Sequence, residues 1–171
     1  MSIQMLTQIF LQYGALFIFL LVLLEYMNLP GLPAGIIMPL AGIWASKGKI
    51  SFVTVMIITV LAGLLGSWLL YLLGRLGGGL FIPWYLKCFP GQRPRIEKYL
   101  EMLRKKGAMS VFISKLIPVT RTIISIPAGA VKMDFLLYTI SSAGGILIWN
   151  FVLVGAGYWA GDAALKWFAL N

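Results

Sequence analysis

The sequence contains no histidine and a single cysteine, Cys88, among its 171 residues. A chain without histidine lacks the commonest metal ligand and the side chain that most often transfers protons near neutral pH. A single cysteine cannot form an internal disulfide. No two acids lie close together in an apolar segment, and no serine has an evident base that would activate it as a nucleophile. We therefore expect no enzyme activity, no metal site and no cofactor.

Charged residues are also scarce, at 11% of the chain, whereas soluble domains contain about 25%. Hydrophobic residues make up 60%, and the mean hydropathy is +0.93. These values predict an all-α integral membrane protein, and the length suits one domain over residues 1–171. The first apolar run has no basic segment before it and is too long for a cleaved signal peptide, so we expect a retained helix.

Three apolar segments match the length of about 20 residues that a helix needs to cross a bilayer. They are predicted to be spanning helices over residues 3–24, 51–74 and 135–160. Two further segments, about 25–46 and 108–131, are apolar but contain prolines, which remove backbone donors and disrupt helices. We expect each of these two segments to form a re-entrant helical hairpin that enters the membrane and returns. The predicted hairpin breaks are Pro30, Pro33, Pro118 and Pro127.

A short internal repeat supports this arrangement. Pro33-Ala34-Gly35 is echoed by Pro127-Ala128-Gly129, and each precedes a predicted span. Those spans end in Tyr71-x-x-Gly74 and Tyr158-x-x-Gly161. Segments interrupted by proline and glycine in corresponding halves of a membrane protein indicate inverted repeats with a binding site between them. We therefore expect the two hairpins to enter from opposite leaflets.

Basic residues outnumber acids, 14 against five, and they concentrate in one loop. Residues 75–106 hold eight cations and two acids, which gives a net charge of +6. Within this loop, the apolar residues at 96, 99, 100 and 103 have helical spacing, which predicts an amphipathic surface helix over residues 94–106. The positive-inside rule places the loop in the cytoplasm. In so apolar a chain, the excess of cations fits anionic lipid headgroups better than nucleic acid.

The segment 114–130 carries two cations, Lys115 and Arg121, in apolar surroundings. A charge near the bilayer centre costs about 2.5–3.5 kcal/mol on insertion scales, so such residues are usually functional. The two cations would lie about 240° apart around a straight helix, and only the break at Pro118 lets both face one cavity. Together with nearby hydroxyls they would bind a phosphate or a carboxylate. The predicted headgroup ligands are Arg121, Lys115, Thr120, Thr122 and Ser125.

A structural role for the same two cations stays open. In that case Lys115 would extend to the membrane surface, and Arg121 would pair with Glu25. Glu25 is the only acid inside an apolar run, and it is predicted either to carry a proton or to act as the counter-ion of Arg121. Asn150, in the last predicted span, is expected to bind a neighbouring helix rather than a ligand.

These residues resemble the DedA family of bacterial membrane proteins, which is related to the SNARE-associated or VTT domain. The run 115–122, followed by Pro127-Ala128-Gly129, is similar to the family's second hairpin, and Glu25 with the prolines after it is similar to the first. Ser67-x-x-x-Tyr71-x-x-Gly74-Arg75 is similar to the family's second span. The chain departs from the family where Lys115 replaces an arginine, where Ser67 replaces an acid, and where Gly35 stands near the position of a second acid.

The resemblance implies two facing re-entrant hairpins in a bacterial cytoplasmic membrane and a flippase or scramblase activity. The implied substrates are undecaprenyl phosphate or phospholipids such as phosphatidylethanolamine. The alternative is a proton-coupled ion or small-solute transporter that depends on Glu25, and a third reading is a membrane scaffold that recruits partners through residues 94–106. The expected partners are membrane lipids and, under the coupled mechanisms, protons; a homo-oligomer stays open. Proton coupling through a pair of acids is less expected here, since Glu25 alone remains.

Overall fold

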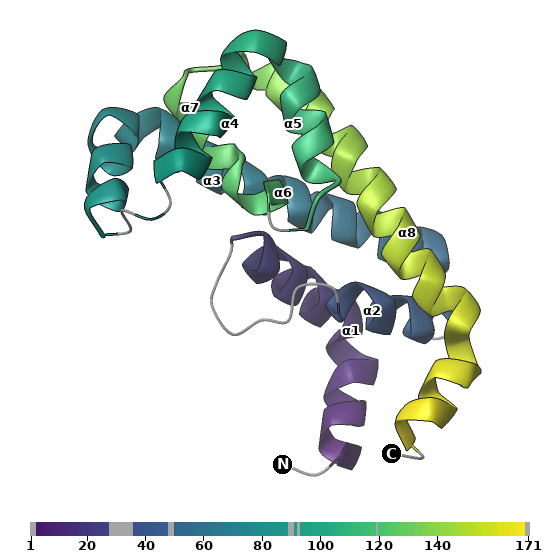
Figure 1. Ribbon diagram of the computed structural model, residues 1–171. Helices are drawn as coiled ribbons and strands as arrows, with labels where there is room; N and C mark the ends of the chain where they lie inside the picture. Colours follow the sequence, from purple (N-terminus) through teal and green to yellow (C-terminus); the bar gives the residue numbers. More distant parts are fainter. Residues whose placement is uncertain are drawn as a thin grey trace.

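The computed structural model describes residues 3–27, 36–47, 50–88, 91, 93–118 and 120–169, and the regular elements in these residues are helices (Figure 1). The predicted all-α class is therefore confirmed. In chain order the helices are α1 (Ile3–Tyr26), α2 (Ile37–Ser46), α3 (Phe52–Cys88), α4 (Arg93–Lys106), α5 (Ala108–Lys115), α6 (Thr120–Ile123), α7 (Ser125–Ala130) and α8 (Phe135–Ala169).

The long apolar helices α3 and α8 are both candidate membrane spans. Their apolar sections, Phe52–Gly77 and Phe135–Gly161, contain 26 and 27 residues, which is enough to cross a bilayer. Both helices continue beyond their predicted ends. α3 continues through Pro83, and α8 bends at Gly161, where a φ of 28° departs from helical geometry.

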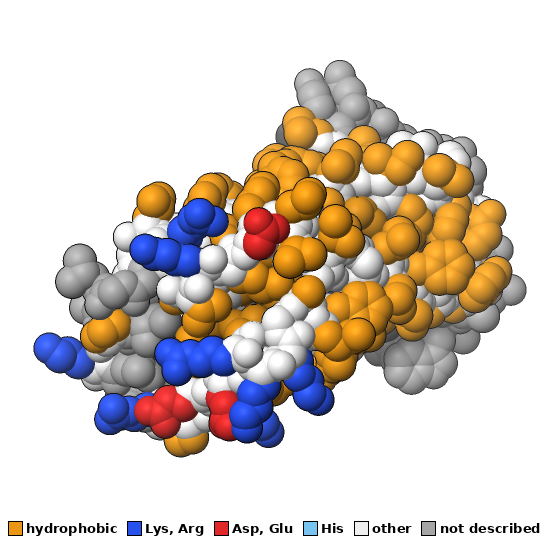
Figure 2. All heavy atoms as spheres, turned by 90° about the horizontal axis from the view of Figure 1, so that it is seen from above, with side chains coloured by type: hydrophobic (Ala, Val, Ile, Leu, Met, Phe, Trp, Pro, Cys, Tyr) orange, Lys and Arg blue, Asp and Glu red, His pale blue; other side chains and the backbone are white. Residues whose placement is uncertain are grey.

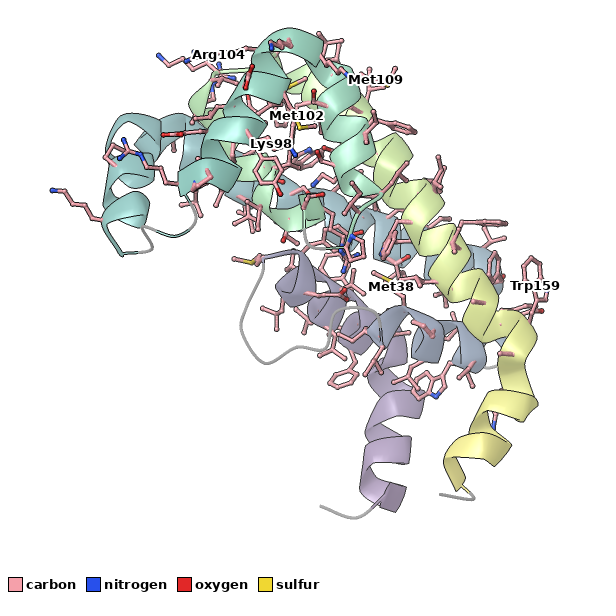
Figure 3. The ribbon with its side chains drawn as sticks, viewed as in Figure 1. Met38, Lys98, Met102, Arg104, Met109 and Trp159 are labelled. Atoms are coloured by element: carbon pink, nitrogen blue, oxygen red, sulfur yellow. The ribbon has the colours of Figure 1, made fainter. Side chains whose placement is uncertain are left out.

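Large apolar side chains cover the outer surfaces of α3 and α8. Figure 2 shows hydrophobic side chains over much of the visible face, with Lys and Arg gathered in one part of it. Trp159 is 80% exposed and points away from α8 (Figure 3). An apolar surface of this extent marks contact with a partner or a membrane. The exposed apolar residues of these two helices include Leu61, Leu65, Leu69, Leu73, Leu76, Leu136, Ile140, Leu147, Ile148 and Val152.

The helix α1 covers the predicted segment 3–24 and ends shortly after it. Its apolar section with described side chains, Gly14–Tyr26, is shorter than a membrane span. A spanning role for α1 therefore stays a prediction. The predicted breaks Pro30 and Pro33 lie outside the described residues.

Prolines occupy two kinds of position in the segments predicted to be hairpins. Pro118 lies in the turn between α5 and α6. Pro127 lies inside the first turn of α7, and Pro39 lies inside the first turn of α2. The N–H groups of a first turn have no partner within the helix, so a proline costs little there. Pro127 is the third residue of α7, and α6 ends at Ile123, four residues before this proline. The roles of the prolines as hairpin breaks and the placement of both segments as re-entrant hairpins stay predictions.

The helices α2 and α8 pack backbone against backbone at two glycines. A Cβ atom added to Gly42 of α2 would lie 2.0 Å from the carbonyl oxygen of Val154. One added to Gly157 of α8 would lie 2.0 Å from the carbonyl oxygen of Pro39. No side chain fits at such a distance, so glycine is required on both helices. Small residues allow this close approach between helices of membrane proteins.

The helices α7 and α3 pack in the same reciprocal way. A Cβ atom added to Gly129 of α7 would lie 2.0 Å from the carbonyl oxygen of Tyr71, and one added to Gly74 of α3 would lie 2.1 Å from that of Ile126. A short helix from each half of the chain therefore packs on the long helix of the other half. The two halves, α1–α3 and α5–α8, are joined by this exchange.

These reciprocal contacts define an internal repeat whose register differs from that of the sequence pattern. By its contacts, Gly42 corresponds to Gly129, whereas the pattern pairs Gly129 with Gly35, which lies outside the described residues. Likewise, Gly157 corresponds to Gly74, whereas the pattern pairs Gly74 with Gly161. The chain contains 19 glycines, so a short match that includes glycine is too frequent to define the register.

The predicted amphipathic helix is present as α4. Ile96 and Leu103 are buried on its inner side, while Arg104 points outward from it (Figure 3). The helical spacing of the apolar residues therefore predicted the helix correctly, and one face of α4 packs against the protein while the other is exposed. The contact of α4 with a membrane surface stays a prediction.

The buried apolar residues form two clusters. One cluster draws on α1, α2, α3 and α8 and contains Val22 and Val154. The other draws on α3, α4, α5, α7 and α8 and contains Tyr71 and Val111. Because α3 and α8 contribute to both clusters, they connect the two halves of the molecule.

Candidate functional site

Buried polar side chains from six helices form two hydrogen-bonded groups in the interior, one around Arg121 and one around Lys115, which together we call the network. The helices are α1, α3, α5, α6, α7 and α8, and the network contains two cations, Lys115 and Arg121, and one acid, Glu25. Of the predicted headgroup ligands, all are buried except Thr120, which is partly exposed. Buried charges are costly unless they are paired and hydrogen-bonded, so the partners of each cation decide what it can do.

Arg121, in α6, forms a buried ion pair with Glu25 near the C-terminal end of α1. Nη2 of Arg121 donates a hydrogen bond to Oε1 of Glu25, and the two residues are 1% and 4% exposed. Figure 1 shows α6 beside this end of α1. The pairing predicted as the structural alternative for Arg121 is therefore present. The pair links α1 of the first half to α6 of the second half. Removing one partner of a buried ion pair lowers stability by about 3–5 kcal/mol, so this link is expected to be strong.

Tyr26 extends this pair to α8. Its hydroxyl accepts a hydrogen bond from Nη1 of Arg121 at 3.3 Å and donates one to Oδ1 of Asn150 at 3.1 Å. The guanidinium also lies over the Tyr26 ring, with 4.7 Å between Cζ and the ring centroid. Asn150 thus binds a neighbouring helix, as predicted. A cation over an aromatic face is stabilised by the ring quadrupole, more strongly where water is excluded.

Three buried donors around Arg121 have no hydrogen-bond acceptor among the residues that the structure describes. They are Nε of Arg121, Nε1 of Trp149 and Nδ2 of Asn150. The ring of Trp149 lies 5.5 Å from Cζ of Arg121. A buried donor without an acceptor costs about 1–3 kcal/mol, so a group of three suits a ligand that brings several acceptors. An anion with multiple oxygens has this property.

Lys115, the last residue of α5, is fully buried and does not reach the surface. The snorkelling arrangement predicted as an alternative is therefore wrong. Its Nζ donates to the hydroxyls of Ser67 in α3 and Ser125 in α7, at 2.8 and 3.1 Å. It also lies 5.9 Å from the ring centroid of Tyr138, whose own hydroxyl donates to the carbonyl oxygen of Ser67 at 3.0 Å.

Glycine on each long helix makes room for the side chains of this network. A Cβ atom added to Gly145 of α8 would lie 2.4 Å from Cβ of Lys115. One added to Gly66 of α3 would lie 2.8 Å from Cβ of Tyr26. Both distances are below normal van der Waals contact, so α5 and α1 reach their positions only because these two residues lack side chains.

The predicted hydroxyl ligands have different roles in the structure. Ser125 binds the Lys115 ammonium. Thr120 donates from Oγ1 to the carbonyl oxygen of Ser114 at 2.7 Å, across the break between α5 and α6. Thr122 is buried in α6 beside Arg121 in sequence. Ser125 thus belongs to the network directly, whereas Thr120 stabilises the turn that positions α6.

Sequence reasoning missed several residues of the network. Tyr26, Tyr138 and Gly145 had no signal of their own, because aromatic residues and glycine are frequent in this chain. Trp149 had no signal of its own either, although its ring lies 5.5 Å from Cζ of Arg121. Ser67 had a signal, since it stands where the resembling family has an acid, and the structure places it on Lys115.

Comparison with known proteins identifies the family. The VTT domain matches residues 32–159. The chain is 34% identical over 164 residues to undecaprenyl phosphate transporter A of Staphylococcus aureus, covering 94% of this chain and 80% of that protein. It is 32% identical over 131 residues to undecaprenyl phosphate transporter A of Bacillus subtilis, covering 77% and 66%. Protein DedA of Escherichia coli strain K12 is 26% identical over 152 residues, covering 87% and 68%. No solved structure matches the chain.

The VTT match covers most of the chain and includes both buried cations. It also includes the two candidate spans, apart from the last two residues of the second. The relationship suggested by the proline-broken run 115–122 is therefore confirmed. The chain belongs to the VTT-domain, or DedA, family of membrane proteins.

Proposed function

We propose that the protein is a flippase or scramblase that moves a phosphate-bearing lipid across the bacterial cytoplasmic membrane without changing it chemically. Undecaprenyl phosphate is the first proposed substrate, because two relatives at 34% and 32% identity are named for it. A phospholipid such as phosphatidylethanolamine is the second. The observation that carries the proposal is the group of buried donors around Arg121 that have no acceptor in the described part of the chain.

In the proposed mechanism the phosphate of the headgroup binds at Arg121. Its oxygens would accept hydrogen bonds from the guanidinium, from Trp149 and from Asn150, the donors that lack acceptors in the described residues. Arginine presents a planar fork that matches phosphate geometry. Hydrogen bonds to charged groups contribute about 1.5–3 kcal/mol each, so several of them offset part of the cost of moving a phosphate through apolar surroundings.

Glu25 is proposed to compete with the phosphate for Arg121. Its ion pair neutralises the guanidinium while no lipid is bound. When a phosphate replaces it, the carboxylate must move away or take up a proton, because two anions at one buried cation repel each other. Glu25 is thus proposed as the counter-ion that later releases the lipid, and proton uptake at its carboxylate is the step through which transport would depend on a proton gradient.

The proposed topology follows the charge distribution. Residues 75–106, with a net charge of +6, would face the cytoplasm. Residues 25–46 and 108–131 would form the two re-entrant hairpins, and Arg121 and Glu25 would meet between them. The apolar tails of the lipid would stay in the bilayer while the headgroup passes the buried network.

The test is a transport measurement in sealed proteoliposomes that contain undecaprenyl phosphate with a radiolabelled phosphate. An external alkaline phosphatase releases label from the outer leaflet only, so complete release requires movement between leaflets. We expect the purified protein to speed the release of the protected fraction. Arg121→Ala should slow it at least about tenfold, since a loss of about 1.4 kcal/mol in binding has that effect.

Arg104→Ala is the matched control, because it removes an arginine that points outward from α4 (Figure 3). It should leave transport unchanged. Because Arg121→Ala breaks the ion pair and so destabilises the fold, the double variant Glu25→Ala/Arg121→Ala is measured as well and should fold but not transport. Wild-type protein that behaves like empty liposomes, for undecaprenyl phosphate and for phosphatidylethanolamine probed with an amine reagent, would exclude the proposal. Proton-driven solute uptake by such protein would favour the proton-coupled transporter instead.

A further inference from the structure

The two buried cations differ in what surrounds them. Arg121 faces the carboxylate of Glu25, whereas the ammonium of Lys115 donates hydrogen bonds to the hydroxyls of Ser67 and Ser125. No carboxylate among the described residues forms an ion pair with Lys115. Hydroxyl groups and the ring of an aromatic residue solvate an ammonium but do not cancel its charge. The buried network therefore contains two cations against one acid.

Ser67 lies at the position that determines whether the charge of Lys115 is neutralised. It is 1% exposed on α3, and its Oγ is 2.8 Å from Nζ of Lys115. Its backbone carbonyl accepts the hydroxyl of Tyr138 at 3.0 Å, which holds α3 and α8 together at this level. A carboxylate at position 67 would reach the ammonium at ion-pair distance. The serine reaches it as well, but leaves its charge uncompensated.

A further buried hydroxyl lies close to this place. Ser142 is fully buried, and its hydroxyl lies beside that of Tyr138. It lies about one turn from Tyr138 and from Gly145 on the same face of α8, and both of those residues contact Lys115. The surroundings of the ammonium thus hold several buried hydroxyls and an unbalanced charge. An anionic group with several oxygens would accept hydrogen bonds from the hydroxyls and balance the charge.

We propose that Ser67 is a specificity-determining residue that makes the site select phosphate monoesters over headgroups without net charge. This inference rests on the proposed lipid transport. A phosphate monoester carries about −1.5 to −2 charges near neutral pH, and two cations balance it once Glu25 has moved away or taken up a proton. The phosphate of phosphatidylethanolamine is already balanced by the amine of the same headgroup. The residue type at position 67 thus determines the net charge of the site through Lys115, with no contact to Arg121.

The test uses proteoliposomes that contain both undecaprenyl phosphate and phosphatidylethanolamine, so that one preparation reports both rates. Wild-type protein should move undecaprenyl phosphate faster than phosphatidylethanolamine. Ser67→Asp should slow the movement of undecaprenyl phosphate about tenfold, which corresponds to about 1.4 kcal/mol. It should change the movement of phosphatidylethanolamine much less, because that headgroup does not need the unbalanced charge.

Ser67→Asn is the matched control, since asparagine has nearly the shape of aspartate but no charge, and it should retain the wild-type preference. Ser125→Asp approaches the same ammonium from α7 and should reproduce the effect of Ser67→Asp if the latter variant fails to fold. An equal loss in Ser67→Asn, an unchanged preference in the folded aspartate variants, or a wild-type preference for phosphatidylethanolamine would each overturn the inference while lipid transport itself stands. Wild-type protein that moves neither lipid would instead remove the proposed function on which the inference rests.

Discussion

The two halves of the molecule share a packing scheme but differ in their polar residues. In each half a short helix packs through glycine on the long helix of the other, Gly42 of α2 on α8 and Gly129 of α7 on α3. Both buried cations belong to the second half, and the acid Glu25 belongs to the first. The scaffold is therefore duplicated while the charges are divided, so the site is complete only where the halves meet.

The same difference appears at the ends of α1 and α5, where Tyr26 and Lys115 take corresponding positions. Each is the last residue of its helix. Each packs its Cβ against a glycine of the long helix in its own half, Gly66 or Gly145. Each then hydrogen-bonds to a side chain on the long helix of the other half. One position thus holds a neutral partner for Arg121 and the other holds a cation, which shows how a repeated scaffold acquires distinct binding groups.

The largest expected effect comes from removing the ion pair that joins the halves. Arg121→Ala should lower the free energy of unfolding by about 3–5 kcal/mol, because it leaves a buried carboxylate without the cation that balances it. Adding Glu25→Ala in the same chain should restore most of the loss. Thermal unfolding in detergent of both single variants and the double variant measures the coupling energy. Strictly additive losses would show that the charges, although close, do not hold the halves together.

A smaller and equal effect is expected from the glycines that form the shared packing scheme. Gly42→Ala and Gly129→Ala should each lower stability by about 1–3 kcal/mol, as overpacking does in other cores. In both variants the new methyl group would meet a backbone oxygen at 2.0 Å. Gly155→Ala is the control, since its nearest contact would be the Trp159 ring at 3.8 Å. A loss in only one half would show that the scheme is not shared.

Much of this arrangement could be predicted from composition and from the scarcity of acids. Low charge and long apolar runs indicate a membrane protein with helices near 51–74 and 135–160, since few other structures bury such segments. The partner of Arg121 could be named because Glu25 is the only acid inside an apolar run. Because Glu25 is the one candidate, its pairing with Arg121 follows from the free-energy cost of burying either charge without a partner. The helix α4 followed from its amphipathic spacing.

The partners of Lys115 could not be predicted in the same way. Hydroxyl residues are numerous, and nothing local to Tyr138 indicates that it lies opposite a lysine, while Ser67 stood out only because the resembling family has an acid there. Those contacts depend on how α3, α5 and α8 pack, which in turn depends on backbone approach at glycines far apart in the chain. For the same reason, Gly35 was matched with Gly129 from sequence, whereas Gly42 makes the corresponding contact. Packing between helices, rather than local sequence, sets the register of the repeat.

The smallest expected effect concerns α4, which takes no part in the reciprocal packing of α2 on α8 and of α7 on α3. There Nζ of Lys105 donates to Oε1 of Glu101 at 2.6 Å, with both side chains exposed. This hydrogen bond lowers the pKa of Glu101 from its ordinary value of 4.5. The stabilisation is therefore present at neutral pH and is lost as the pH falls below 4.5. Because water and salt screen exposed pairs, Glu101→Gln should leave the unfolding midpoint at neutral pH nearly unchanged.

The informative comparison is with Glu25→Gln, which alters a pair of the same charges in the buried network. Both variants replace a carboxylate by an amide of similar shape, so they differ mainly in the surroundings of the cation left behind. Lys105 would be solvated by water, whereas Arg121 would keep its charge where only 1% of the residue is exposed. Unfolding midpoints measured at low and high salt should therefore separate the two variants. If Glu101→Gln lowered the unfolding midpoint as much as Glu25→Gln, burial would not determine the strength of these pairs. The ion pair between the halves would then contribute no more to stability than an exposed pair.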